Sequence, residues 1–312
     1  MSPGLGGWVA FNALILALLA LDLGVFHRRA HVPGAREALR WTIAWIVLAL
    51  AFGAWLYLRA GQEIALEYLT GYVVEKSLSI DNIFVMVMVF GYFGVPARDQ
   101  HRVLFWGILG ALVLRGAFIG AGSFALHRWH WLLYGFGALL LVTGLRTALD
   151  KGEPPDLERN PLVRLTRRFL PVAADYEGHS FLVFRGGKLQ ATPLLLALCV
   201  IEASDVVFAV DSIPAVFAIT DEPFLVYTSN IFAILGLRSM YFVLADFVRR
   251  FEYLKYGLSG ILVFVGAKML LDGVYRVPTP VSLAVISATV ALSILVSVLR
   301  PSEAGARPAP RE

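Results

Sequence analysis

Long runs of apolar residues alternate with short polar segments along the whole chain. A helix of about 20 apolar residues spans the hydrocarbon core of a bilayer. Helices are expected because a backbone exposed to lipid must satisfy its own hydrogen bonds. This pattern predicts an all-α integral membrane protein with about nine transmembrane helices. The nine predicted spans cover approximately residues 8–26, 41–58, 70–92, 103–124, 130–149, 192–213, 224–245, 256–271 and 280–299.

The composition agrees with this pattern. Of the 312 residues, 58% are hydrophobic and 16% are charged, and the mean hydropathy is +0.71. A soluble domain is typically about a quarter charged. The chain has one cysteine, which excludes a disulfide framework and a cysteine zinc cluster.

The basic residues between the predicted spans indicate how the chain crosses the membrane. With the N-terminus outside, 19 Lys and Arg residues fall in inside loops and 3 fall in outside loops. An excess of Lys and Arg marks the cytoplasmic side. We therefore expect a multi-pass membrane protein with its N-terminus outside and its C-terminus in the cytoplasm. This distribution accounts for the pI near 9.2 and argues against a nucleic-acid-binding face.

The spans are expected to form a single transmembrane domain, residues 1–300, with one long cytoplasmic loop at about 150–191. In that loop an apolar run at 180–184 ends in Arg-Gly-Gly-Lys, which allows a β-hairpin, although a plain linker is the favoured interpretation. The basic stretch 159–168 is interpreted as ordinary loop charge, with a patch for anionic lipid or a partner as the alternative. The tail, 301–312, is predicted to be disordered.

Spans three to five are weakly repeated in spans six to eight. Charged residues inside the spans match at similar offsets, Asp81 with Asp205 and Arg115 with Arg238. An odd number of spans per repeat inverts the second copy in the membrane, and inverted repeats are typical of transporters. We predict two inverted three-helix repeats, at about 70–150 and 192–272. Four further matches lie 122 residues apart: Tyr134-Gly135 with Tyr256-Gly257, Gly144 with Gly266, Arg146 with Lys268, and Asp150 with Asp272.

Two of the predicted spans carry acidic residues within apolar sequence. A charge at the bilayer centre costs roughly 2.5–3.5 kcal/mol on insertion scales, so several of them indicate a polar cavity that faces away from lipid. A helix turns about 100° per residue, so one straight helix cannot direct all of them at one ion. The acids are Glu75 and Asp81 in span three, and Glu202, Asp205 and Asp211 in span six.

Buried ion pairs are one explanation for these acids. Arg115 and Arg238 lie in spans four and seven, and Lys76 lies beside Glu75. An Asp–Arg pair between helices would lock the bundle without any ligand. Five acids and three nearby cations still leave a surplus of about two negative charges, which a bound cation would balance.

The ligands on offer are oxygen atoms. Asn82, Ser79 and Ser204 accompany the carboxylates, and neither span contains histidine. Oxygen sites suit Mg²⁺, Ca²⁺ and Mn²⁺ rather than copper or zinc. A thioether from Met86 or Met88 would favour Mn²⁺ over Mg²⁺, although a methionine in a membrane helix usually serves packing. Pro214 is expected either to kink the helix near Asp211 or to end it.

These residues carry a resemblance. The segments Glu75–Asn82 (EKSLSIDN) and Glu202–Pro214 (EASDVVFAVDSIP) resemble the two signature segments of the TerC family, particularly its Alx-like members. The family is named for tellurium resistance, and the resemblance implies manganese export across the bacterial inner membrane. It also implies a relationship to LysE-like transporters with inverted three-helix repeats. It also implies that six residues of this chain belong to the metal path: Glu75, Asp81, Asn82, Glu202, Asp205 and Asp211.

The expected function is therefore a secondary transporter that exports divalent cations, most of all Mn²⁺, with no prosthetic group and no enzymatic activity. Asp81 and Asp205 would form the central pair. Proton coupling is compatible with this site because only an unprotonated carboxylate binds metal. No Gly-rich phosphate loop is present in the sequence, so ATP is not the expected energy source. Residues expected to support or gate the site are Ser79, Ser204, Arg115, Arg238 and Lys76.

Two alternatives from other classes stay open. In an intramembrane aspartyl protease, Asp81 and Asp205 would share a proton, although neither has the Gly-x-Gly-Asp arrangement. In a membrane scaffold, the acids would only form ion pairs. The other expected partner is the lipid bilayer, and the sequence predicts no particular oligomeric state.

Overall fold

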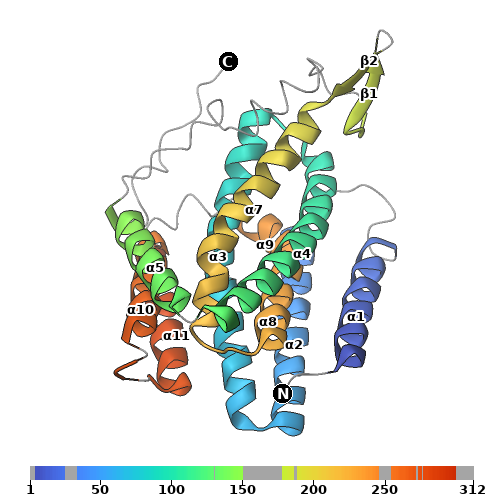
Figure 1. The fold of residues 1–312 in the computed structure, drawn as a ribbon. Coiled ribbons are helices and arrows are strands. Elements are labelled where there is room, and N and C mark those ends of the chain that lie inside the picture. The colour runs from blue at the N-terminus through green and yellow to red at the C-terminus, as the bar shows by residue number, and fades with distance from the viewer. Residues whose placement is uncertain are drawn as a thin grey trace.

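The computed structural model describes residues 4–24, 34–129, 131–149, 178–185, 188–245, 254–271, 273–275 and 277–299. This part of the chain is almost entirely helical (Figure 1). The elements are α1 (Leu5–Gly24), α2 (Ala35–Ala60), α3 (Gln62–Phe93), α4 (Ala97–Arg128), α5 (Leu132–Leu149), β1 (Leu182–Arg185), β2 (Lys188–Ala191), α7 (Pro193–Phe217), α8 (Pro223–Leu235), α9 (Leu237–Leu244), α10 (Leu254–Leu271) and α11 (Thr279–Leu299).

The described residues form ten helices, so the expected count of nine is wrong. The seventh predicted span, 224–245, is broken at Gly236 into α8 and α9. Glycine has a low helix propensity, and the Lys76 ammonium lies only 2.8 Å from where a Cβ of residue 236 would be. Lys76 Nζ also donates a hydrogen bond to the Ala233 carbonyl at 3.1 Å. This bond satisfies an acceptor at the end of α8, as a break within a membrane requires.

The helices have the length and surface of a membrane protein. Five of those described are long and apolar enough to cross a bilayer. Large apolar side chains face outward, among them Val113, Phe124 and Leu292, as expected for surfaces in contact with lipid. The chain is therefore an all-α integral membrane protein. The five candidate spans are Ala35–Ala60, Ala97–Leu126, Leu132–Leu149, Pro193–Phe217 and Thr279–Ser297.

Two groups of helices can be followed in Figure 1. Helices α3 and α7 lie side by side at the centre, with α8 packed against α3 and α4 packed against α7 and α8. Helices α5, α10 and α11 form a second group at one edge, which reaches the centre through contacts of α11 with α3 and of α5 with α7. The α3–α4–α7–α8 arrangement positions the buried polar residues described below.

Helices α5 and α10 approach each other through residues that are glycine or serine. Gly137 faces Gly266, and Gly144 faces Ser259. The residue numbers run in opposite directions along the two helices, so the pair is antiparallel. An added Cβ at Gly266 would lie 2.7 Å from the Gly137 carbonyl oxygen. Small residues of this kind let membrane helices pack backbone to backbone.

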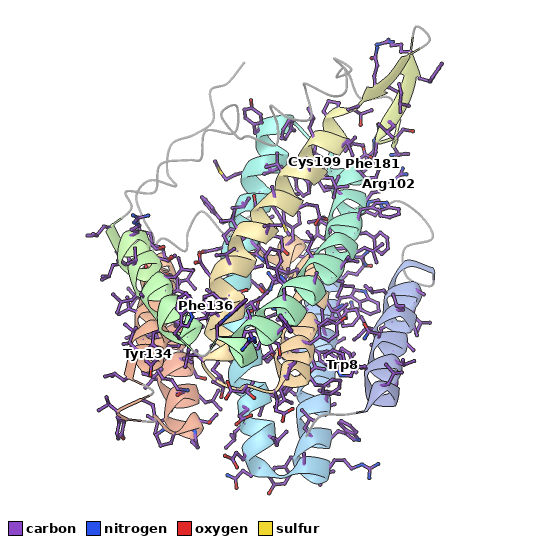
Figure 2. The ribbon with its side chains drawn as sticks, in the orientation of Figure 1. Trp8, Arg102, Tyr134, Phe136, Phe181 and Cys199 are labelled. Atoms are coloured by element: carbon purple, nitrogen blue, oxygen red, sulfur yellow. The ribbon has the colours of Figure 1, made fainter. Side chains whose placement is uncertain are left out.

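The segment before α7 is a β-hairpin rather than a plain linker. Strands β1 and β2 pair antiparallel, from Leu182 opposite Ala191 to Arg185 opposite Lys188. The Arg102 guanidinium lies 5.2 Å from the centre of the Phe181 ring, which joins the base of the hairpin to α4 (Figure 2). The rest of the predicted loop, 150–177, and the tail, 301–312, lie outside the described residues.

The close contact between α5 and α10 can be tested by adding one methyl group. Gly266→Ala places a Cβ within 2.8 Å of backbone atoms of α5, and such overpacking typically costs about 1–3 kcal/mol. We expect a lower melting temperature of the purified protein in detergent. The control is Gly260→Ala on the same helix, whose nearest neighbour would be Thr289 Cγ2 at 3.7 Å. Equal melting temperatures for the two variants would contradict this packing.

Candidate metal-ion site in the membrane domain

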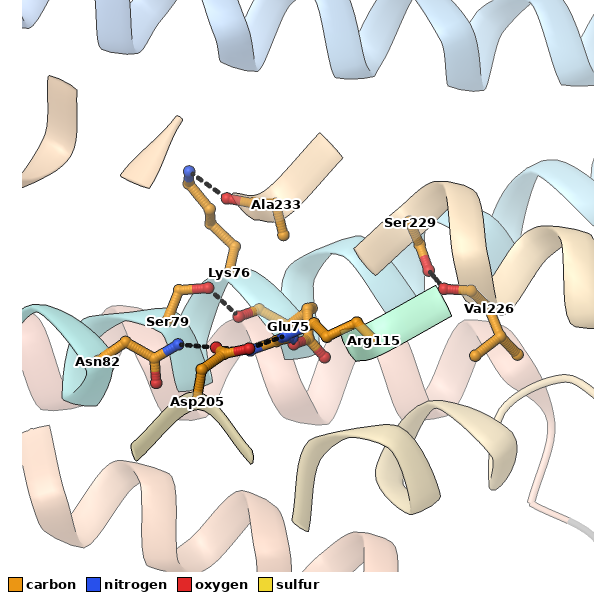
Figure 3. A network of polar contacts seen from close by, with 9 residues as sticks. All are labelled: Glu75, Lys76, Ser79, Asn82, Arg115, Asp205, Val226, Ser229 and Ala233. Carbon is orange, nitrogen blue, oxygen red and sulfur yellow. Dashed lines mark hydrogen bonds and ion pairs between the residues drawn. The ribbon is translucent and has the colours of Figure 1, made fainter. Parts of the chain in front are cut away.

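Arg115 of α4 lies at the point where α3, α4 and α7 meet, and only 1% of its surface is exposed. Its Nε donates to Asp205 Oδ2 at 3.1 Å and its Nη2 donates to Asp205 Oδ1 at 2.9 Å. Its Nη1 donates to Glu75 Oε1. One guanidinium thus bridges carboxylates from α3 and α7 (Figure 3). The fork geometry of arginine suits such two-point binding of a carboxylate.

This triad is not electrically balanced. One positive charge faces two carboxylates. The desolvation cost of burying a charge is compensated only when that charge is paired and hydrogen-bonded. Asn82 Nδ2 of α3 adds a long contact to Asp205 Oδ1, at 3.5 Å. Asn82, rather than its neighbour Asp81, is therefore the residue of α3 that contacts Asp205.

A small cavity lies on the other side of Asp205. Its volume is about 20 Å³, which is room for roughly one water molecule. Glu202 and Asp205 of α7 and Asn82 of α3 provide polar groups to its wall, and Met86 provides its thioether. Glu202 Oε2 is buried and has no hydrogen-bond partner in the described part of the chain. The cavity therefore has an acidic group on its wall that Arg115 does not neutralise.

The structure does not gather all the predicted acids at this cavity. Glu75 is held by Arg115, and Asp211 accepts a hydrogen bond from Thr143 of α5 at 3.3 Å. Asp81 is not among the residues that line the cavity. Within the described ranges, no three His, Cys, Asp or Glu residues are placed to hold one metal ion. Two acids, an amide and the Ser204 hydroxyl are thus the side-chain oxygen groups of the cavity lining.

The predicted supporting residues occupy different places. Ser79 Oγ donates to the Glu75 carbonyl at 2.7 Å, and Ser204 Oγ donates to the Val200 carbonyl at 2.8 Å. Both hydroxyl protons are therefore used within their own helices. Ser204 also lines the cavity. Arg238 is buried in α9, and Lys76 reaches the end of α8 (Figure 3).

One feature of the site was not predicted from the sequence. Gly110 of α4 faces the Glu202 carboxylate at a distance that leaves no room for a side chain. The glycine pair Gly107 and Gly110, three residues apart, is a sequence signal that could have marked this face of α4. Pro214 does not end α7, because the helix continues to Phe217, so that alternative for Pro214 is wrong.

The fold is that of an integral membrane protein, and the buried ion pairs give this protein a polar interior. The model of the integral membrane protein TerC family matches residues 60–304, and the chain belongs to this family. No solved structure matches the chain.

Relatives match along nearly the whole chain. An uncharacterized membrane protein of Myxococcus xanthus is 52% identical over 97% of this chain and 94% of its own length. The putative membrane-bound redox modulator Alx of Escherichia coli K12 is 46% identical over 93% of both chains. A membrane protein of Rickettsia bellii is 41% identical over 94% of this chain and 97% of its own.

Removing the guanidinium should destabilise the fold. Arg115→Met leaves Glu75 and Asp205 buried without their cation, and breaking a buried pair in this way costs about 3–5 kcal/mol. We expect that decrease in the free energy of unfolding, measured by denaturant titration in mixed micelles.

The control neutralises the partners as well. Adding Glu75→Gln and Asp205→Asn to Arg115→Met should restore most of the lost stability, because no unpaired charge is left. An unchanged stability of Arg115→Met alone would show that the triad does not hold the helices together.

Proposed function

We propose that this protein is a secondary transporter that exports divalent cations, with Mn²⁺ as the main substrate, and not an enzyme. The observation that carries the proposal is the position of Glu202. It lies beside Asp205 at the cavity, and one of its buried oxygens has no partner in the described residues. An acid in that position attracts a cation.

A scaffold held together by ion pairs accounts for only part of the site. It explains Glu75, Arg115 and Asp205, which are paired with one another. It does not explain why Glu202 adds a further carboxylate next to Asp205, because like charges repel in a low-dielectric interior. A cation bound between Glu202 and Asp205 removes this repulsion.

The chemistry of the cavity wall supports a hard divalent cation. Carboxylates and the Asn82 amide suit Mg²⁺, Ca²⁺ and Mn²⁺. Met86 also lines the cavity, and its softer sulfur favours Mn²⁺ over Mg²⁺. The cavity, at about 20 Å³, is too small for a fully hydrated ion. The ion therefore loses water to enter, or enters when the helices move apart.

Transport requires that the site open alternately to the two sides. The proposal keeps the two inverted repeats expected from the sequence. The contacts that support them are those of α3 with α8, of α7 with α4, and of α5 with α10. The 122-residue offset of the repeat relates Gly137 to Ser259 and Gly144 to Gly266. The contact of Gly137 with Gly266 is therefore the repeat counterpart of the contact of Gly144 with Ser259. In the proposal, these repeats rock about their shared contacts, in a bacterial inner membrane with the N-terminus outside and the C-terminus in the cytoplasm.

Arg115 has a defined part in this cycle. In the absence of an ion it holds Asp205 through two hydrogen bonds. A divalent ion at the cavity shares Asp205 and weakens that hold, which links ion binding to the packing of α4 against α7. Because the carboxylates must be unprotonated to bind metal, affinity falls as the pH falls, and protons are the proposed counter-substrate.

The name of the Alx relatives describes a redox role for those proteins. This chain has one cysteine, Cys199. A single thiol cannot form a disulfide within the chain, so an internal dithiol–disulfide cycle is not available to it.

The proposal predicts Mn²⁺ efflux from proteoliposomes loaded with Mn²⁺. Glu202→Gln and Asp205→Asn should each reduce the initial rate at least tenfold, because each removes a charged ligand. Glu63→Gln, at the exposed start of α3, is the matched control and should leave the rate unchanged. Efflux that persists in both site variants would refute the site.

The same assay separates the alternatives. If Asp81→Asn and Asp205→Asn both leave efflux unchanged, the central pair expected from the sequence is wrong. Cleavage of a membrane substrate that depends on Asp81 would favour a protease. Absence of efflux together with absence of an Mn²⁺-dependent shift in melting temperature would favour a scaffold.

A further inference from the structure

The face of α4 that points toward Glu202 has no side chain at one position. A Cβ added at Gly110 would lie within 2.5 Å of Glu202 Cδ and Oε2, and closer still to Oε1. Real Cβ atoms essentially never approach other atoms so closely. The Glu202 carboxylate therefore occupies the space that a side chain of residue 110 would take.

This close approach is local to Gly110. One turn earlier on α4, a Cβ at Gly107 would be 3.9 Å from Glu202 Oε1, an ordinary contact distance. Further along the same helix, a Cβ at Gly120 would meet nothing within 4 Å. The carboxylate thus lies over one residue of α4 rather than against a generally glycine-lined surface.

We propose that Gly110 is a positioning residue that sets the ion affinity of the site. Its missing side chain lets the Glu202 carboxylate lie against α4, at the wall of the cavity, so that the space beside Asp205 stays free for the ion. This inference rests on the proposed function, because it assigns the cavity to a divalent cation.

The geometry gives the direction of the effect. Glu202 Oε2 has no hydrogen-bond partner among the described residues, so available space rather than a hydrogen bond keeps that oxygen at the wall. A methyl group at position 110 displaces the carboxylate. The neighbouring open volume is the cavity of about 20 Å³, and a displaced carboxylate fills it. The ligand positions of a binding site must hold within about 0.5 Å, so the displaced carboxylate weakens ion binding.

The test is Mn²⁺ binding to the purified full-length protein in detergent, measured by titration calorimetry. Gly110→Ala should raise the Kd for Mn²⁺ at least tenfold. Gly120→Ala makes the same substitution on the same helix in open space, and should change the Kd less than twofold. The melting temperature of each variant without Mn²⁺ is measured in parallel, and should stay near that of the wild type.

A double variant distinguishes positioning from a general disturbance of α4. Glu202→Asp shortens the side chain by one methylene and withdraws the carboxylate from residue 110. In that background, Gly110→Ala should raise the Kd less than threefold. If Gly110→Ala alone does not fold, the double variant should fold, because the clash is gone.

Each other outcome overturns the inference. A Kd of Gly110→Ala within twofold of the wild type, or a penalty that is equally large in the Glu202→Asp background, shows that Gly110 does not position Glu202. Failure of both single and double variants to fold shows the same. If the wild type does not bind Mn²⁺ at all, the proposed function fails with it, so the two failures are distinguishable.

Discussion

A guanidinium and two carboxylates that are buried together in a membrane domain must satisfy one another, because lipid offers them no other partner. Arg115 meets this requirement with groups from α3 and α7. Helices α3, α4 and α7 are therefore held by a contact that works in only one arrangement of the three. Apolar packing between membrane helices is much less specific, since lipid tails are as apolar as the side chains they replace. The position of the cavity follows from this triad.

The same carboxylate serves stability and the proposed transport. Asp205 is bound by Arg115 on one side and faces the cavity on the other. In the proposed function, an ion at the cavity would compete with Arg115 for Asp205, so ion binding would draw on the same interaction that holds the resting packing. A membrane domain that held its helices through apolar contacts alone would have no such link between a ligand and its helix arrangement.

The sequence predicts the helical class and the acids, because both depend on residue type along one segment. Hydropathy identifies the segments, and an acid in an apolar run is conspicuous whatever surrounds it. Which acids meet depends on helix rotation, about 100° per residue. The side chains of Asp81 and Asn82 therefore point in different directions, and Asn82 is the one that contacts Asp205. The break at Gly236 and the role of Gly110 depend on side chains from other helices, Lys76 and Glu202, which no single segment reveals.

The antiparallel contact between α5 and α10 bears on how the protein is assembled. Gly137 and Gly144 lie on a face of α5 whose backbone partner is supplied by α10, more than a hundred residues later in the chain. At ribosomal rates of about 5–20 residues per second, α10 emerges roughly ten seconds after α5. Throughout that interval the glycine face of α5 lacks the backbone of α10. The 18 residues of α5 must therefore stay helical in the membrane before this neighbour exists.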